Sequence, residues 1–418
     1  MPGPYHLKAV TLNNANNSFN GYYLRQEIQT ENPKPDIIVV GYQEANDVAS
    51  SLSMPGYTLI SDESYTTMTK PFKLAEVGQC ILVKDEHIDE IFVRKESIKK
   101  EHWIHGYNKG GVRVELELLK QDGSSKTIGI ASGHFDTENP QYRKDEFDAL
   151  VEGFSACDGE IILADYNERL ITYNANGQTI LEVIEAYQQE KQLEDVTHQT
   201  LLESRDNTGT LIHAELHRIL IKDFCPLLSN EDQRYDGYTF RETEILTYVK
   251  FDNEGNIKAS NDSNHPYKIG AFDNIAYKDN SEDKHLISPE GSAKVYRNYD
   301  SDHSYVSTTY TVTTDTVQPE FESESQTLLN KLKAKIQSKS FDLGFGGSRY
   351  SVNINDKKYE VPHRIYKIYN ILNSQEEWSR KKQGIKTITS DKFHASNFLF
   401  GRTQSSTDQY IKALDRKI

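Results

Sequence analysis

Six short polar motifs, each attached to a run of apolar residues of strand length, constrain the fold of this chain more than any other feature. They contain an Asn, a Gln-Glu pair, a Lys before two glycines, a His, an Asp-x-Asn element, and an Asp-Asn pair with a later Ser-Asp-His. In chain order they lie at residues 11–13, 43–44, 108–111, 132–134, 165–169, and 273–274 with 301–303. A fold that brings strand ends to one edge would gather all six in one place.

The apolar runs themselves indicate short buried strands, because they are rich in β-branched residues and bounded by polar ones. Between several of these runs lie segments whose apolar residues have helical spacing. The pattern predicts an α/β (α+β) fold in which two β-sheets pack face to face as a sandwich flanked by helices. The strands are expected at residues 37–40, 81–83, 112–116, 128–132 and 161–163, and the helices at 20–29, 142–154, 179–192 and 210–222.

Length and charge narrow the class of protein. A chain of 418 residues is comfortable for two domains. The net charge of −15 at pH 7 argues against broad binding to duplex nucleic acid, which needs many Lys and Arg contacts to phosphate. Three distant cysteines suggest no disulfide framework or zinc cluster. We see no signal peptide and no apolar run long enough for a membrane-spanning helix, so a cytoplasmic location is expected.

The last hundred residues read differently from the rest. Residues 313–326 are polar and acidic, include a proline, and are interpreted as a linker. The preceding residues 1–312 form the predicted sandwich domain, and residues 327–418 form a mainly helical accessory module without recognised chemistry. Within that module helices are expected at 327–338, 363–372 and 407–414, with a hairpin over 349–361.

The residue types in the motifs suit a metal-assisted attack of water on a phosphate ester. Glu44 follows four apolar strand residues and is the first choice of ligand for a hard cation, with Asn13 as a second. Asp165 and Asn167, two residues apart on an extended chain, could orient a water and donate to a phosphate oxygen. Each also has an ordinary explanation: a solvated strand-end carboxylate, a turn asparagine, or an Asx-turn that ends a strand.

These motifs, in this order, resemble the endonuclease/exonuclease/phosphatase superfamily, and most of all the inositol polyphosphate 5-phosphatases. The similarity spans roughly residues 5 to 312. It departs from the family pattern at Ala164, Asn274 and Tyr305, and the family's Pro-Pro-Thr-Tyr-Lys-Tyr-Asp stretch is at best echoed by residues 237–240.

The resemblance implies further roles for named residues. Asp273 would orient His303, which with His134 would donate to the scissile phosphate, and Asp302 would lie beside the metal. Lys109 would meet a neighbouring ring phosphate. Three further basic residues, Arg143, Lys144 and Arg169, are candidate substrate contacts, although Arg169 could equally form a structural ion pair. A buried core histidine and a lysine on a glycine turn are the ordinary alternatives.

The leading hypothesis is a phosphomonoesterase of lipid signalling that uses Mg²⁺, with Mn²⁺ as a substitute, and removes the 5-phosphate from phosphoinositides or soluble inositol polyphosphates. An alternative is a Mg²⁺-dependent nuclease or other phosphodiesterase, including a sphingomyelinase-like one. A catalytically dead phosphoinositide-binding scaffold is a third. Peripheral membrane contact is expected near residues 62–74, unless this is an ordinary surface loop. The accessory module could bind a protein or a membrane, and its polar composition faintly resembles accessory regions of secreted bacterial effectors that act in a host cytosol.

Overall fold

The structure is a computed structural model of the whole chain. It describes residues 4–70, 73–99, 109–120, 123–154, 156–193, 209–225, 235, 237–243, 246–250, 252–254, 258–261, 263, 265, 267–281, 285–298, 301–314, 324–338, 341, 349–355, 357–374, 378–390, 410–411 and 414.

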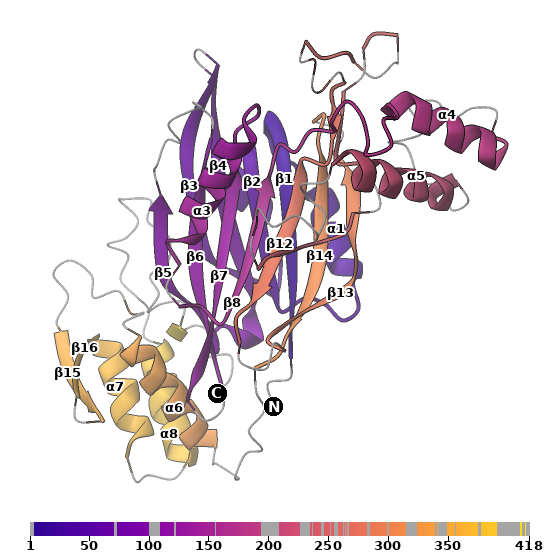
Figure 1. Cartoon of the computed structure of the whole chain (residues 1–418). Helices are drawn as coiled ribbons and strands as arrows, with labels where there is room; N and C mark the ends of the chain where they lie inside the picture. Colours follow the sequence, from indigo (N-terminus) through magenta and orange to yellow (C-terminus); the bar gives the residue numbers. More distant parts are fainter. Residues whose placement is uncertain are drawn as a thin grey trace.

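Two six-stranded sheets form the body of the molecule (Figure 1). In spatial order, the first sheet contains β13 (Ile287–Arg297), β14 (Ser304–Val312), β1 (Tyr5–Ser18), β2 (Ile37–Asn46), β4 (Lys73–Lys84) and β3 (Tyr57–Lys70). The second contains β5 (Ile91–Lys99), β6 (Gly110–Leu119), β7 (Ser125–His134), β8 (Gly159–Asp165), β12 (Asp273–Asp279) and β9 (Thr239–Phe240). Each sheet has one parallel pair, β1 with β2 and β7 with β8.

Burial on both faces explains why the central strands are continuously apolar. In β2, Ile37 and Val39 point into the core between the sheets, whereas Ile38 and Val40 pack in a separate outer cluster. Strand β8 repeats the arrangement, because Ile161 lies in the core between the sheets and Ile162 lies in the cluster on the outer face of the second sheet. The period-2 alternation of side chains therefore supplies two cores from one apolar run.

Helices cover the outer faces. Helix α1 (Tyr22–Thr30) packs on the first sheet and is followed by the short α2 (Val48–Ser51). Helices α3 (Pro140–Val151), α4 (Ile180–Lys191) and α5 (Gly209–Phe224) join the cluster on the outer side of the second sheet. The Asn139 side chain caps α3, and Thr179 with Glu182 forms a capping box on α4. The predicted two-sheet sandwich with outer helices is confirmed.

The C-terminal residues have a core of their own. Helices α6 (Glu324–Gln337), α7 (His363–Leu372) and α8 (Trp378–Ser390) pack with a hairpin of β15 (Arg349–Ile354) and β16 (Lys357–Pro362). The hairpin and the helix at 363–372 match the sequence-based expectation, whereas α8 was not foreseen. Most of the linker at 313–326 and of the helix at 407–414 lies outside the described residues. The exact domain division stays a prediction.

One expectation about the surface changes. Residues 62–70 and 73–74 belong to strands β3 and β4 rather than to a loop, and Tyr65 is buried, so its ring is not available to a membrane. Among the described residues no helix is both long and apolar enough to cross a membrane. Cys80, Cys157 and Cys225 are buried free thiols, in agreement with the absence of a predicted disulfide framework.

Candidate active site

Register between neighbouring strands places four of the motifs side by side. In the second sheet His134 at the end of β7 pairs with Asp165 at the end of β8, and Asp165 pairs with Asp273 at the start of β12. Lys109 immediately precedes β6, whose first residue pairs with His134. Asn13 reaches the same edge from β1 in the facing sheet. The predicted gathering of the motifs at one edge is therefore present.

Asp165 is the centre of this cluster. Asn13 Nδ2 donates to Asp165 Oδ2 over 2.9 Å, and His134 Nε2 lies 3.4 Å from the same oxygen. The backbone N–H of Asn167 donates to Asp165 Oδ1 over 2.9 Å. Burial would raise the pKa of Asp165, but the positive charge of His303, His134 and Lys109 and the Asn13 hydrogen bond hold it below its ordinary value. Asp165 is thus a fixed carboxylate that stays ionised.

His303 and Asp273 form a second buried unit. His303 Nδ1 lies 2.8 Å from Asp273 Oδ2, and the Asp273 backbone N–H donates to Thr247 Oγ1 over 2.9 Å. Burial by itself would lower the pKa of His303, but the negative charge of Asp273, with Asp165 and Asp302, raises it above its ordinary value. The imidazolium is therefore the favoured form, and it presents Nε2 as a donor.

Lys109 completes the row of cationic groups. It is almost fully buried, and its Nζ hydrogen-bonds with His134 Nε2. Burial lowers its pKa, against the opposing effect of Asp165 and Glu44. Gly110 has a φ of +149°, and a Cβ on Gly111 would come within 2.6 Å of a Leu150 methyl carbon. The two glycines thus allow the first residues of β6 to pack closely against α3 and β7.

Glu44 does not lie beyond the end of its strand as predicted. Strand β2 continues to Asn46, and Glu44 falls at a register irregularity with a φ of +48°. A bulge turns one residue away from the regular alternation, so the half-buried carboxylate can face the site while the strand continues. Asn16 Nδ2 donates to Glu44 Oε2 over 2.8 Å.

The carboxylate oxygens of Asp165 and Asp273 suit a hard divalent cation, which prefers oxygen ligands, whereas His303 is engaged by Asp273. Ligand atoms of Asp165, Asp273 and His303 all lie within 4.8 Å of one another. Asp273 Oδ1 is buried and has no hydrogen-bond partner in the part of the chain that the structure describes. A buried carboxylate oxygen in that position is costly without a cation or donor. Asp302, the third ligand expected from the resemblance, instead contacts Lys250 over 2.6 Å.

Asn167 differs from the expectation of an extended chain. Its φ of +52° places it in the left-handed region, immediately after β8 ends at Asp165. Its backbone N–H bonds to Asp165 and its side-chain Nδ2 donates to the Phe135 carbonyl over 2.9 Å. This is the Asx-turn that the sequence left open as an alternative. A direct role of Asn167 at a phosphate stays a prediction.

The three basic candidates have different surroundings. Arg143 is buried and makes a two-point ion pair with Glu168 over 3.0 and 3.1 Å, so its guanidinium is engaged inside the fold. Lys144 pairs with Asp148 on the same helix. Arg169 Cζ lies 5.9 Å from the centre of the Phe272 ring, and its Nε has no hydrogen-bond partner among the described residues. Their roles at a substrate stay predictions, and Arg143 has a clear structural role.

One segment at the site was missed by sequence reasoning. Residues 247–250 contribute Thr247, Tyr248 and Lys250, and Tyr248 stacks on Phe272 with ring centroids 4.3 Å apart and contacts His303. The proposed family echo at 237–240 is instead beside Glu160, at the start of β8 and away from the site. A Thr-Tyr pair followed by a lysine was the available signal.

Comparisons with known proteins give structural neighbours alone. No family model matches the chain, and no curated protein matches it. Similar solved structures include the inositol polyphosphate 5-phosphatase domain of SPsynaptojanin in complex with inositol (1,4)-bisphosphate and calcium, at 18% identity and a TM-score of 0.45 over 80% of this chain and 91% of that one. Cimex nitrophorin, as a ferrous NO complex, has 15% identity and a TM-score of 0.43 over 75% and 100%.

A mannosyl-6-phosphatase of Bacteroides thetaiotaomicron has 12% identity and a TM-score of 0.34 over 73% and 99% of the two chains. Other similar structures carry the name of the endonuclease/exonuclease/phosphatase family. These neighbours include both groups that the sequence motifs resemble.

Proposed function

We propose that this chain is a Mg²⁺-dependent phosphomonoesterase that removes the 5-phosphate from inositol phosphates or phosphoinositides. One observation carries the proposal: an ionised carboxylate, Asp165, lies among the nitrogen groups of Lys109, His134 and His303 in a buried cluster at the edge of the sandwich. Lys109 and His134 flank it on one side and His303 on the other. Such a cluster suits a reaction in which water attacks phosphorus and negative charge develops on the phosphate oxygens.

Asp165 is positioned to act on the water. Asn13 and the Asn167 backbone N–H each hold one of its oxygens, which fixes the plane of the carboxylate. Its lowered pKa keeps it ionised at neutral pH, so it can align a water and receive its proton. The proton remains on the carboxylate or passes to solvent after the phosphate leaves.

His303 is positioned to act on the phosphate. Asp273 holds Nδ1, which leaves Nε2–H to donate to a phosphate oxygen as charge develops there. Lys109, next to β6, supplies further positive charge, and its ammonium donates to His134 Nε2 at the end of β7. The alkoxide of the ring then leaves opposite the attacking water, as an in-line displacement requires.

A divalent cation would neutralise phosphate charge and stabilise the leaving oxygen when bound. The residues that would hold it are Glu44 and Asn13, while Asp302 is paired with Lys250. The nearby carboxylates of Asp165 and Asp273 add negative charge. Oxygen ligands of this kind suit Mg²⁺, which retains several waters. Mn²⁺ is the expected substitute.

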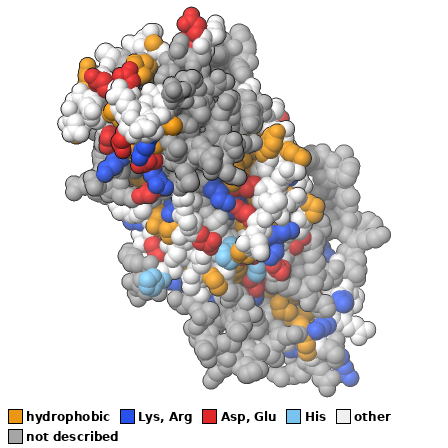
Figure 2. All heavy atoms as spheres, turned by 90° about the vertical axis from the view of Figure 1, so that its right-hand side faces the viewer, with side chains coloured by type: hydrophobic (Ala, Val, Ile, Leu, Met, Phe, Trp, Pro, Cys, Tyr) orange, Lys and Arg blue, Asp and Glu red, His pale blue; other side chains and the backbone are white. Residues whose placement is uncertain are grey.

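The substrate class follows from the sequence resemblance and from local charge. Lys109 and Lys250 lie at the site within a chain of net charge −15. Figure 2 shows one face on which the described basic side chains are interspersed with acidic ones and form no continuous band. A small polyanion is therefore favoured over a long nucleic acid.

The test is release of inorganic phosphate from a panel of inositol phosphates and short-chain phosphoinositides, with Mg²⁺ and with chelator. We expect Mg²⁺-dependent release from 5-phosphorylated compounds only. Release from isomers that lack a 5-phosphate would refute the positional assignment. No phosphate release from any compound of the panel would refute the proposed phosphomonoesterase activity.

A phosphodiesterase is the second candidate, and one observation keeps it open. Arg143 was a candidate substrate contact, but Glu168 holds it inside the fold. Plasmid nicking before and after Lys109→Ala separates the two hypotheses. A diesterase keeps its nicking activity in the variant, whereas a 5-phosphatase has none to begin with and loses phosphate release.

A further inference from the structure

A second group of possible metal ligands lies at the end of the sandwich opposite the candidate active site. Asp36 precedes β2, while Glu86 and His87 belong to the single turn η1 (Asp85–His87) between β4 and β5. The His6 backbone N–H bonds to Asp36, so this group is level with the start of β1. From His6 to Asn13 the strand rises about 3.3 Å per residue, which separates the two groups by roughly 23 Å.

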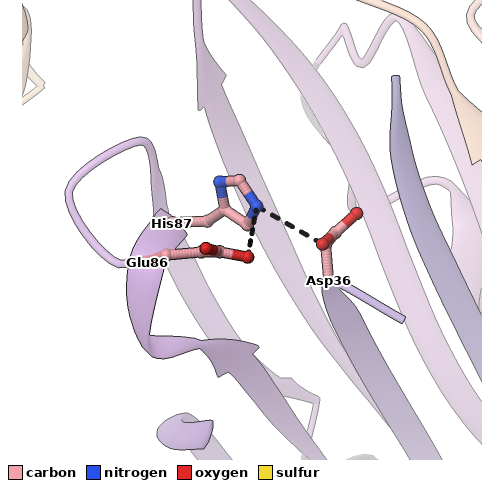
Figure 3. Close-up of side chains that lie close together, drawn as sticks. All are labelled: Asp36, Glu86 and His87. Carbon is pink, nitrogen blue, oxygen red and sulfur yellow. Dashed lines mark ion pairs between the residues drawn. The ribbon is translucent and has the colours of Figure 1, made fainter. Parts of the chain in front are cut away.

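The three side chains converge on one point (Figure 3). His87 Nε2 lies 3.3 Å from Asp36 Oδ1 and 3.7 Å from Glu86 Oε1. All three ligand atoms lie within 4.8 Å of one another. Metal–ligand bonds of about 2.0–2.1 Å in a tetrahedral site place neighbouring ligand atoms about 3.3–3.4 Å apart. The observed separations are close to that spacing.

The atoms that would not bind a metal are held by other partners. His87 Nδ1 lies 3.0 Å from Glu90 Oε2, and Asp36 Oδ2 accepts the His6 backbone N–H over 2.9 Å. Glu90 in turn accepts the Tyr5 hydroxyl over 3.0 Å. A carboxylate on the far nitrogen of a histidine fixes its tautomer and aims Nε2 at a metal, which is the usual outer arrangement of a metal site.

We propose that Asp36, Glu86 and His87 bind a divalent first-row cation, with Zn²⁺ as the best match, and leave one position for water. One imidazole and two carboxylates suit Zn²⁺ better than Mg²⁺ or Ca²⁺, which prefer oxygen ligands alone. The two carboxylates that face the imidazole nitrogen are paired with the Lys84 ammonium, and a bound cation would take the place of that ammonium.

Lys84 competes with the cation for this site. Its Nζ lies 3.6 Å from Asp36 Oδ1 and also pairs with Glu86. The Lys84 side chain is 32% exposed, so the long stem can turn into solvent when a metal binds. The proposal therefore makes an unusual prediction: removing a positive charge next to the ligands strengthens binding.

The site also connects the sandwich to the C-terminal residues. Glu90, which orients His87, forms a buried ion pair with Lys331 of α6. Tyr5 of β1 shares the same carboxylate. A metal on His87 would therefore stabilise the end of the sandwich against which α6 packs, and would not touch the candidate active site.

The experiment measures Zn²⁺ binding to the full chain, freed of metal with chelator, by equilibrium dialysis and metal analysis. We expect one equivalent, in addition to any cation at the candidate active site, that His87→Gln removes, that Glu86→Gln weakens about tenfold, and that Asp273→Asn at the other end of the sandwich leaves in place. Co²⁺ at the same site should give the visible bands of four-coordinate geometry, again lost in His87→Gln only.

Lys84→Met is a variant that tests the proposal without removing a metal ligand. It should raise Zn²⁺ affinity about tenfold, whereas a site with no metal function predicts no change. Glu86 is largely exposed, so Glu86→Gln should retain the far-ultraviolet circular dichroism of the parent. The proposal is overturned if Zn²⁺ binding is the same in Glu86→Gln and His87→Gln as in the parent. It is also overturned if Asp273→Asn abolishes all Zn²⁺ binding. It does not rest on the proposed phosphatase function, because phosphate release is expected to be unchanged in Glu86→Gln.

Discussion

The two ends of the sandwich each contain one histidine and two carboxylates, but in different surroundings. At one end Asp165, Asp273 and His303 are all buried and come from two strand ends of the second sheet and the loop before β14. At the other end Asp36 is buried, His87 is partly exposed and the Glu86 side chain is 58% exposed. The first group has fixed geometry and little access to water. The second can exchange a lysine, a proton or a metal ion.

The comparison shows that one histidine and two carboxylates can contribute to catalysis or to stability. Which of the two they do depends on the cationic groups that pair with the carboxylates. At the first end Asp165 faces Lys109 and two histidines whose donors can turn to a phosphate. At the second end the cations are Lys84 of β4 and Lys331 of α6, which already belong to structural pairs. Variants at the two ends should therefore have separate effects on catalysis and on folding.

The largest expected effect is on turnover. Asp273→Asn removes the carboxylate that fixes His303, so we expect kcat to fall about a thousandfold, with a smaller change in KM. Phosphate release under saturating Mg²⁺ measures it. Asp36→Asn at the other end is the matched control and should keep kcat within about twofold. Equal losses in the two variants would show that the ends are not functionally separate.

The dependence of kcat on pH is the next effect in size. Activity needs Asp165 ionised and His303 protonated. The pKa of Asp165 is lowered and that of His303 is raised, so the active form should persist beyond the ordinary range of both groups. We expect a broad plateau, a loss of about tenfold per pH unit below it, and a similar loss on the alkaline side above the usual imidazole pKa. An alkaline fall near pH 6 to 7 would contradict the Asp273–His303 pair.

Substitutions at the end of the sandwich that contains His87 should change the free energy of unfolding. Glu90 accepts from Tyr5, His87 and Lys331, so Glu90→Gln leaves a buried ammonium without its counter-ion. Loss of one partner of a buried pair costs about 3 kcal/mol in the free energy of unfolding. Urea denaturation of metal-free protein measures the change, with exposed Glu86→Gln as the control. A variant with unaltered stability would mean that Lys331 finds another partner.

The sequence predicted the first end much better than the second. Buried strands leave long apolar runs, so the residues that follow them can be placed at one edge without knowing any contact. The ion pair of Arg143 with Glu168 was not predictable, because Glu168 lies in a motif that suggested chemistry and not packing. Asp36, Glu86 and His87 follow no apolar period, and only the return of β4 beside β2 brings them together.

The smallest expected effect concerns a buried lysine where α6 meets the sandwich. Lys335 Nζ lies over the rings of Phe92, Phe341 and Tyr410, at 4.9, 5.6 and 5.3 Å from their centres. Burial lowers its pKa to about 8, although Asp89 opposes the shift. Between about pH 8 and the ordinary value of 10.5 the unfolded chain binds more protons than the folded chain, so this group makes stability rise with pH.

His87 has the opposite sign, which makes Lys335→Met a sensitive comparison of the two groups. Burial disfavours the His87 cation, but Asp36 and Glu90 raise its pKa to about 9, so its stabilisation is complete below the ordinary value of 6.5 and is lost as pH rises through 9. In the parent the two trends offset each other between pH 8 and 9. In metal-free Lys335→Met only the His87 loss remains, and we expect a steeper decline in the urea midpoint above pH 8, with stability at pH 7 higher by roughly 1 kcal/mol because a buried charge is gone. If the variant is instead less stable at pH 7, the three rings stabilise the ammonium by more than its burial costs.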